Sequence, residues 1–382
     1  MSAPPLRIPF NRPTHTRRVD EYVAQALHSG HLSGDGEFTR RCQELLGELL
    51  GGSTVLLTTS GTHALELTAL LLDIGPGDEV IVPSFTFSST VNAFVLRGAI
   101  PVFIDIRPDT LNLDERRLEA LITGRTRAIV PVHYAGVGCE MSSILEVAAR
   151  HAIPVVEDNA HGLFGRYRDR LLGTFGVMAA QSFHETKNFS CGEGGAIVIN
   201  DPAYVERAEI IREKGTNRRQ FFLGQVDKYT WVDLGSSFLP SDLLAAMLLA
   251  QLEDRDWVRE RRGRIWRRYA DELADWSMAN DVQMPAVPSD RVTPYHLFHM
   301  LMPSERSRDA LLRHLRSAGI LAVFHYQPLH LSPFGRRLQP MSVCPVTEDV
   351  SARLVRLPFY TNMEDADVAT VIEAVRSFNV RQ

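Results

Sequence analysis

The amino-acid sequence predicts an α/β protein built around a mostly parallel sheet. Two observations support this fold class. Short apolar runs of strand length alternate with helical periodicity through the first 200 residues. After residue 200 the alternation gives way to one long arginine-rich helix and a mixed segment. We therefore expect a large domain over residues 1–250 and a smaller C-terminal α+β domain over residues 251–382, with the boundary inside the long helix.

The elements of the predicted large domain follow in a regular order. Strands are expected at 54–58, 79–83, 101–105, 128–134, 154–158, 178–184 and 195–199, and helices at 62–73, 86–96, 114–122 and 141–151. In the second part we expect helices at 241–276, 305–318 and 365–378 and strands at 296–302 and 320–326. Parallel sheets bind ligands at the carboxyl ends of their strands. Ser60, Asp158 and Lys187 all follow or end a predicted strand, so we expect them at one edge of the sheet.

Composition excludes several classes of function. Hydrophobic residues make up 45% and charged residues 23% of the 382 residues, as in an ordinary soluble globular protein. The net charge of −5 argues against nucleic acid as the main partner. The first ten residues form no apolar signal core, and no apolar run approaches the ~20 residues that cross a membrane. The four cysteines have no paired spacing for zinc or disulfides. We expect a cytoplasmic protein with no metal site.

A lysine and an acid are the candidate catalytic and cofactor-binding residues. Lys187 lies in Gln-Ser-Phe-His-Glu-Thr-Lys-Asn-Phe (181–189), and Asp158 ends an apolar run in Val-Val-Glu-Asp-Asn-Ala-His (155–161). A lysine amine can form a Schiff base with an aldehyde. A carboxylate can keep a pyridine nitrogen protonated, so that the ring accepts electrons. Together the two residues suggest pyridoxal 5'-phosphate as cofactor, although neither proves it alone.

Other residues could complete a cofactor site. Ser60, Gly61 and Thr62 join a strand to a helix, where backbone N–H groups can hold a phosphate, but a plain helix cap explains them as well. Phe87 could stack on a flat ring or belong to the core. His161 could cover the ring or be a structural histidine.

Several stretches make the chain resemble the DegT/DnrJ/EryC1/StrS family of sugar aminotransferases, which are pyridoxal-phosphate enzymes of fold type I. These stretches are 59–65, 77–87, 128–136, 156–161 and 182–188. The segments 213–221, 227–237 and 239–242 resemble the branch that aminates C4 of dTDP-4-keto-6-deoxyglucose.

The resemblance implies a role for each matching residue. Lys187 would hold the cofactor and move protons, and Asp158 would pair with the pyridine nitrogen. Phe87 would stack on the ring, while Gly61, Thr62 and Ser182 would bind the phosphate. Many relatives carry an asparagine that reaches the phosphate of a neighbouring subunit. Ser237 stands at that position, so we count it among the cofactor-binding candidates.

A basic loop is the predicted site of the nucleotide-sugar. Its candidates are Lys214, Asn217, Arg218 and Arg219, because arginine binds a diphosphate with forked donors. A solvated basic loop is the alternative, and the resemblance favours the substrate. The resemblance also implies L-glutamate as amino donor and a homodimer in which residues 30–34 and 214–237 serve the partner's site.

Rival functions remain open at this stage. A C3 aminotransferase acting on a related dTDP-keto-sugar is one alternative. A sugar dehydratase on the same fold uses pyridoxamine phosphate, but it carries histidine where Lys187 stands. A regulator would need a basic DNA-binding module, and a nicotinamide oxidoreductase would need Gly-x-Gly-x-x-Gly after an early strand. The configuration of the product, galacto or gluco, is not decided.

Overall fold

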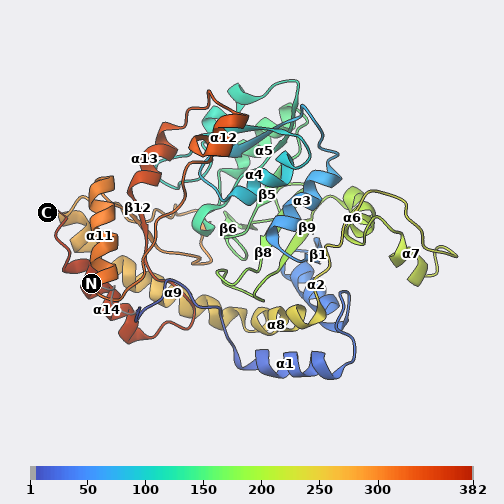
Figure 1. Ribbon diagram of the computed structural model, residues 1–382, viewed down its shortest axis with the longest axis horizontal. Coiled ribbons are helices and arrows are strands. Elements are labelled where there is room, and N and C mark those ends of the chain that lie inside the picture. Colours follow the sequence, from blue (N-terminus) through green and yellow to red (C-terminus); the bar gives the residue numbers. More distant parts are fainter. Residues whose placement is uncertain (1–5, 381–382) are drawn as a thin grey trace.

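The computed structural model describes residues 6–380 (Figure 1). The first five of the ten residues in which we expect no apolar signal core lie outside the described residues. The helices are α1 Arg17–His28, α2 Glu37–Leu49, α3 Gly61–Leu71, α4 Ser88–Val95, α5 Met141–Arg150, α6 Val205–Arg212, α7 Arg218–Phe222, α8 Asp242–Glu253, α9 Arg255–Glu272, α10 Ala274–Ala279, α11 Glu305–Ser317, α12 Pro333–Leu338, α13 Pro345–Arg353 and α14 Asp365–Arg376. The strands are β1 Thr54–Thr58, β2 Glu79–Pro83, β3 Ile100–Ile104, β4 Thr126–Ile129, β5 Val156–Asp158, β6 Arg166–Tyr167, β7 Arg170–Leu171, β8 Met178–Ser182, β9 Gly195–Ile199, β10 Arg291–Val292, β11 His299–Leu301 and β12 Leu354–Arg356.

The central sheet runs in the order β1-β9-β8-β5, then β4-β2-β3. Parallel bridges from Ile129 to Val155 and from Val132 to Asp158 connect the two parts. Strand β9 is antiparallel to both neighbours, and the other strands of the sheet run in one direction. The carboxyl ends of β1, β5 and β8 therefore meet at one edge, as the sequence predicts.

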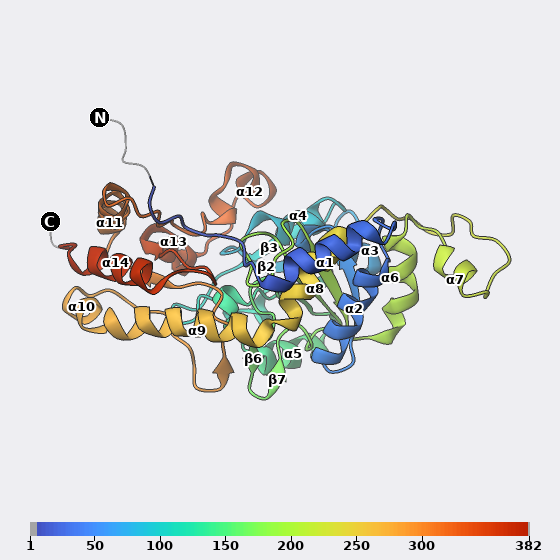
Figure 2. The ribbon, with the colours of Figure 1, turned by 90° about the horizontal axis from the view of Figure 1, so that it is seen from below.

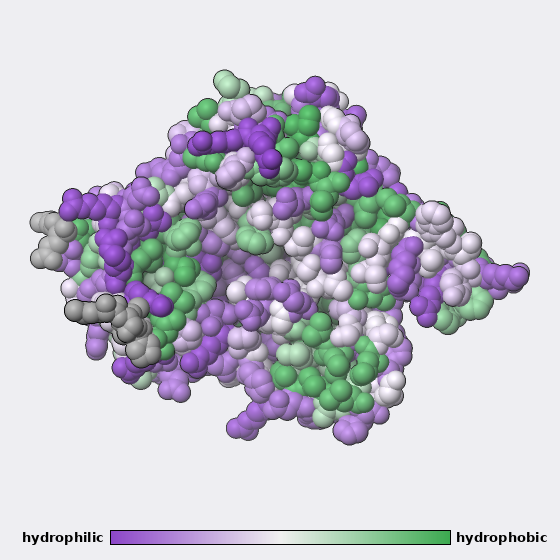
Figure 3. All heavy atoms as spheres, in the orientation of Figure 1, coloured by the Kyte–Doolittle hydropathy of each residue, from purple (hydrophilic) through white to green (hydrophobic). Residues whose placement is uncertain are grey.

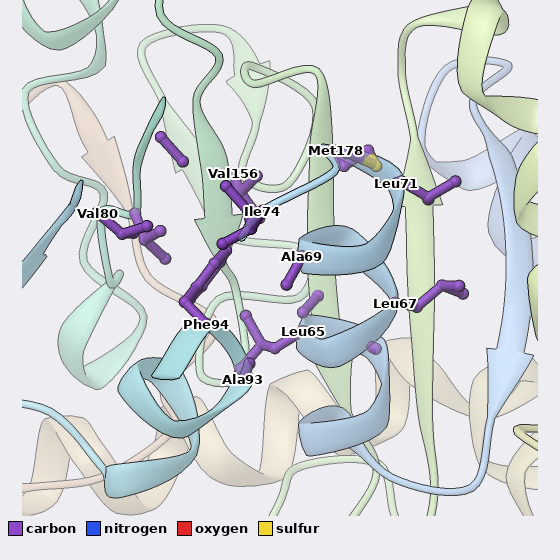
Figure 4. Close-up of a cluster of buried hydrophobic side chains, with 14 of the residues drawn as sticks. Leu65, Leu67, Ala69, Leu71, Ile74, Val80, Ala93, Phe94, Val156 and Met178 are labelled. Atoms are coloured by element: carbon purple, nitrogen blue, oxygen red, sulfur yellow. The ribbon is translucent and has the colours of Figure 1, made fainter. Parts of the chain in front are cut away.

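Apolar packing fixes the sheet between helices. On one face, Leu65 and Leu67 of α3 and Phe94 of α4 pack with Val156 and Met178 of the sheet (Figure 4). Each such buried side chain contributes about 1.5–3 kcal/mol. Helices α1, α2 and α8 cover the other face. The burial holds the start of α3 against the edge where β1 and β8 end.

A separate apolar cluster lies in the C-terminal part. It joins α9, α11 and α14 with β12, and it includes Ile8 from the N-terminal segment. Figure 1 shows this part at one end of the molecule with both chain ends, and α7 at the opposite end. The division at residue 250 remains a prediction.

The predicted helix at 114–122 is wrong. Two short 3-10 turns, Glu115–Arg117 and Glu119–Leu121, occupy the segment. The Asp114 carboxylate accepts from the backbone N–H of Arg116 and pairs with its guanidinium, and such local bonds compete with an α-helix.

The predicted strand at 320–326 is also wrong. Only Ile320 and Val323 make bridges, to Ile8 and Arg356. The neighbouring strand β12 forms its hydrogen-bonded pairs with β11 instead. Strand β11 spans His299–Leu301, within the predicted strand at 296–302.

Two further elements differ in length. Strand β4 spans Thr126–Ile129 instead of 128–134. Beyond it the chain stays beside the sheet through single contacts of Val130 with Ile81 and of Val132 with Asp158, and it turns away at Ala135, whose φ is 56°. The long helix at 241–276 is divided into α8, α9 and α10, with breaks at Asp254 and Leu273. Helices α1 and α2 were not predicted. Within residues 6–380 no helix is both long enough and apolar enough to cross a membrane.

Candidate active site

A cavity of about 340 Å³ opens at the carboxyl ends of β1, β5 and β8. Lys187 and Asp158 both line it, as the sequence predicts. The other predicted cofactor residues that line it are Ser60, Gly61, Thr62, Phe87, His161 and Ser182. The shared edge of the sheet thus brings residues from four distant segments together.

Lys187 follows β8 in a tight turn. The backbone N–H of Lys187 donates to the carbonyl of His184 (2.9 Å), and that of Cys191 donates to the carbonyl of Phe183 (3.0 Å). Burial is the main reason that the pKa of the Lys187 amine is lowered to about 8; the Asp158 carboxylate opposes the shift, and Arg356 adds to it. A lysine with a lowered pKa is a nucleophile and proton acceptor near neutral pH.

The Asp158 carboxylate is held by two direct neighbours, one of which is braced by a third residue. Its Oδ2 accepts from the Thr90 hydroxyl (2.7 Å), and Thr90 is bonded in turn to Thr86 (2.8 Å). Its Oδ1 accepts from the backbone N–H of Ala160 (3.1 Å). These bonds fix the direction of a carboxylate that borders the cavity. Such an acid can hold a ring nitrogen in its protonated form.

The start of α3 can hold a phosphate. The Ser60 hydroxyl caps the helix by accepting from the backbone N–H of His63 (3.0 Å). A Cβ on Gly61 would lie 2.9 Å from the Cβ of Ser182, so glycine lets this turn approach β8. The Thr62 hydroxyl bonds Ser89 (2.8 Å) beside the cavity. The positive end of α3 and these hydroxyls suit an anion.

Two flat side chains border the same space. Phe87 is 60% exposed, so it is not a core residue, and its ring lies 6.4 Å from that of Tyr326. His161 stacks on His296 with 4.1 Å between ring centroids. Burial, then Lys187 and Arg356, lower the pKa of His161 well below its usual range, which keeps the ring neutral. Both rings can contact a planar cofactor.

Among the lining residues that the sequence did not single out, five are remote in sequence from the motifs around Lys187. They are Phe10, His296, His325, Tyr326 and Arg356. They come from the N-terminal segment and the C-terminal part, which no spacing in the sequence connects to the motifs around Lys187. Arg356 offers one signal, because it directly follows the buried apolar pair Leu354-Val355.

The remaining candidates lie elsewhere. Ser237, Lys214, Arg218 and Arg219 line a second cavity of about 850 Å³, together with His31, Ser33 and Gly34. In the same chain they do not border the Lys187 cavity.

Polar partners hold the side chains of this basic loop. Lys214 and Arg218 pair with Glu213 (3.1 and 3.2 Å), and Arg219 pairs with Glu209. The side-chain oxygen of Asn217 accepts from the backbone N–H of Thr230 (2.7 Å), which braces the loop.

The comparisons with known proteins identify the family. The profile of the DegT/DnrJ/EryC1/StrS aminotransferase family matches residues 13–376. The chain belongs to this family. Its fold is similar to TlmJ, an aminotransferase from Streptoalloteichus hindustanus, with 30% identity, 97% of this chain and 98% of that chain covered, and a TM-score of 0.89.

Two further solved structures show the same similarity. PseC from Helicobacter pylori, an aminotransferase of pseudoaminic acid biosynthesis, is 27% identical, with 96% and 98% coverage and a TM-score of 0.89. Spr1654 from Streptococcus pneumoniae, in its PLP form, is 27% identical, with 97% and 98% coverage and a TM-score of 0.88. The chain is a pyridoxal-phosphate-dependent sugar aminotransferase of fold type I.

The residues of the cavity fit this cofactor. When bound, pyridoxal phosphate supplies an aldehyde and a ring that accepts electrons. Lys187 would hold the aldehyde carbon, Asp158 the ring nitrogen, and the start of α3 with Ser182 the phosphate. Among residues 6–380 no group of three or more histidines, cysteines or acids could hold a metal ion.

Proposed function

We propose that the enzyme aminates C4 of dTDP-4-keto-6-deoxy-D-glucose with L-glutamate as amino donor. The proposal depends on one observation: the reacting residues and the cationic loop residues line two different cavities. The Lys187 cavity holds the reacting amine and acid, and the larger cavity at the basic loop holds several cations. A nucleotide-sugar needs both, because its keto carbon must meet the amine while its diphosphate binds cations.

The cations of the loop can exchange their partners for a ligand. Arg218 and Arg219, whose side chains are about half exposed, each pair with one partly buried glutamate. Because solvent reaches the arginine side of each pair, the pair contributes on the order of 1 kcal/mol. A diphosphate presents more charge and accepts bidentate bonds from arginine, so it can displace these carboxylates.

Assembly of two chains would bring the two cavities together. Residues 213–237, here called the arm, project from the body around α7 (Figure 2). Trp231 on the arm is 76% exposed, and Phe222 and Leu223 are exposed beside it. The predicted partner-serving segments, 30–34 and the arm, line one cavity, which supports their acting as one surface.

A second apolar area supports the homodimer. Figure 3 shows hydrophobic atoms gathered over α1 and α8, apart from the arm. Partly buried side chains there include Val23, Leu243, Leu244 and Met247. We infer that a second copy of this chain covers this area and places its arm at the Lys187 cavity.

In this arrangement Lys187 performs the proton transfers. Its amine would take the proton from the α-carbon of glutamate and later deliver a proton to C4 of the sugar. A pKa of about 8 suits both directions at neutral pH. The Asp158 side chain would stay opposite the cofactor ring throughout, held by Thr90 and Ala160.

The proposal is tested by offering the enzyme several nucleotide keto-sugars with L-glutamate and identifying the products by NMR. We expect a 4-amino-4,6-dideoxyhexose linked to dTDP. An amine at C3, or preference for another nucleotide, would contradict the assignment. The NMR couplings of the product also distinguish the galacto and gluco configurations.

A paired substitution tests the basic loop. Arg218→Ala with Arg219→Ala should weaken use of the nucleotide-sugar by roughly 10-fold or more, since charge-assisted bonds are lost, while the glutamate half-reaction stays unchanged. The exposed neighbours Arg336 and Arg337 on α12 provide the matched control pair. Equal loss in both half-reactions, or none in either, would show that the loop does not bind the diphosphate.

The dimer is tested by light scattering coupled to the activity assay. We expect the active species to have twice the mass of the chain. Full activity in a species that scatters as a monomer would contradict the shared site.

A further inference from the structure

A buried chain of hydrogen bonds joins the C-terminal part of the molecule to the turn that follows β2. The Nε2 atom of His330 lies 3.1 Å from Oε1 of Glu348 on α13, and its Nδ1 lies 2.7 Å from the Ser84 hydroxyl. An ionised carboxylate only accepts, so Nε2 carries the hydrogen and Nδ1 accepts from Ser84. The backbone N–H of His330 donates to the Ser84 hydroxyl (3.2 Å), and that of Leu329 donates to the Ser84 carbonyl (3.1 Å).

The order serine, histidine and acid is that of a hydrolytic triad, but burial excludes this activity. Ser84 is 0% exposed and His330 is 1% exposed. A serine nucleophile has to reach its substrate. Neither residue lines the Lys187 cavity or the cavity at the basic loop. The three residues therefore act on the surrounding protein and not on a substrate.

The turn that Ser84 begins supports two groups of the active site. It spans residues 84–87, between β2 and α4. The Thr86 hydroxyl is bonded to Thr90, and Thr90 donates to the Asp158 carboxylate. Phe87, at the end of the turn, borders the Lys187 cavity. The position of this turn therefore determines where the aromatic ring lies and how the carboxylate is held.

A segment of the C-terminal part contacts this turn at two points. The ring centroid of Tyr326, which lines the cavity, lies 5.6 Å from that of Phe85 and 6.4 Å from that of Phe87. Four residues later, His330 bonds Ser84 at the other end of the turn. Helix α12, which follows this segment, lies beside α4, which follows the turn (Figures 1 and 2).

We propose that His330 is a positioning residue of the cofactor site. By holding Ser84 it fixes the turn against Tyr326, and so it determines how Phe87 and Asp158 meet the ring of pyridoxal phosphate. Contacts between rings allow sliding, whereas hydrogen bonds fix direction. A displacement of about 1 Å at a remote support can cost on the order of 100-fold in rate. The inference rests on the proposed roles of Phe87 and Asp158 as ring contacts, and it holds whichever sugar is aminated.

Helix α13 provides both the acid that orients His330 and a matched control. An acid that accepts from one ring nitrogen fixes the tautomer and the orientation of the imidazole, as Glu348 does here. Its neighbour Thr347 is equally buried within the fold, but its hydroxyl donates to Asp105 (2.8 Å) and not to the turn. Loss of the Thr347 hydroxyl should therefore lower stability without moving the cofactor.

The experiment compares His330→Ala, His330→Asn, Ser84→Ala and the control Thr347→Ala. Equilibrium dialysis measures retention of pyridoxal phosphate, and the visible circular dichroism of the bound cofactor reports how the protein holds its ring. Hydrogen exchange in the cofactor-free protein measures the order of residues 84–96. A thermal melt of each variant measures its stability.

We expect His330→Ala and Ser84→Ala to weaken cofactor retention roughly 3- to 10-fold, because one buried hydrogen bond is lost in each. Both should change the dichroism band and speed exchange at residues 84–96. The double variant should lose no more than His330→Ala alone, since both changes remove the same bond. His330→Asn should stay close to wild type, because the side-chain oxygen of asparagine is attached at the same carbon position as Nδ1 and can accept from Ser84.

Unchanged retention and dichroism in Ser84→Ala and His330→Ala would overturn the proposal. Equal changes in Thr347→Ala would overturn it as well, since they would show a general loss of stability. Ser84→Ala removes a single oxygen atom, so it decides the question if His330→Ala does not fold. None of these measurements includes a sugar, so an error in the proposed substrate would leave every expected result in place.

Discussion

The electrostatics of Lys187 lead to a prediction that does not depend on knowing the sugar. Burial lowers the pKa of its amine to about 8, whereas a free lysine has a pKa near 10.4. At pH 7.5 a group with a pKa of 8 is about one-quarter neutral, and an ordinary lysine is about one-thousandth neutral. The fold therefore raises the concentration of reactive amine roughly 200-fold.

Two substitutions should move this pKa in opposite directions. The Asp158 carboxylate favours the charged amine, so Asp158→Asn should lower the pKa of Lys187 further. The Arg356 cation disfavours the charged amine, so Arg356→Gln should raise the pKa. Burial is the largest influence, and neither change removes it, so both variants should stay below the pKa of a free lysine.

The assay is trace reductive methylation of the cofactor-free protein between pH 6.5 and 10.5, with the labelled peptides quantified by mass spectrometry. The sequence has only two other lysines, Lys214 and Lys228, which serve as internal references for the reagent. A midpoint for Lys187 above pH 10 would refute the lowered pKa of its amine. Shifts of the same sign in Asp158→Asn and Arg356→Gln would refute the opposite influences of the two charges.

Two other substitutions test the site and its support. Phe87→Ala should weaken retention of pyridoxal phosphate in equilibrium dialysis, because Phe87 borders the cavity. The control is Leu96→Ala, an exposed apolar residue that does not border it. Glu157→Gln should lower the free energy of unfolding in urea by on the order of 3 kcal/mol. The buried Glu157 carboxylate accepts from three backbone N–H groups, and the NH₂ group of a glutamine would face one of these donors without an acceptor. The exposed Glu48→Gln should leave the stability unchanged. Unchanged retention or unchanged stability would contradict the respective role.

The sequence predicts most of the sheet because local patterns determine it. Strands β1, β2 and β9 have the predicted bounds, since their apolar runs are bordered by turns or polar residues. The break at Asp254 could not be predicted, because neither glycine nor proline marks it and the helical periodicity continues through it. The failed helix at 114–122 has a local cause in the side chain of Asp114, and reading that cap correctly would have avoided the error.

The residues of the active site also fall into those that the sequence predicts and those that it does not. Lys187, Asp158 and the turn at Gly61 could be found from the sequence because each follows a strand that ends at one edge. Arg356 and the histidines around it could not, because the C-terminal part reaches the cavity only through tertiary packing. The place of Ser237 and the basic loop in a second cavity is likewise a property of the assembled fold.

The most direct test of the central claim is the transfer of nitrogen-15 from labelled glutamate to the dTDP-keto-sugar, followed by NMR in wild type and in Lys187→Ala. We expect label on the sugar in every wild-type turnover. In the variant we expect a loss of at least ~10²–10⁴-fold, because positioned proton transfer depends on the Lys187 amine. Multiple turnovers with label transfer in folded Lys187→Ala would contradict the assignment of this lysine as the catalytic residue.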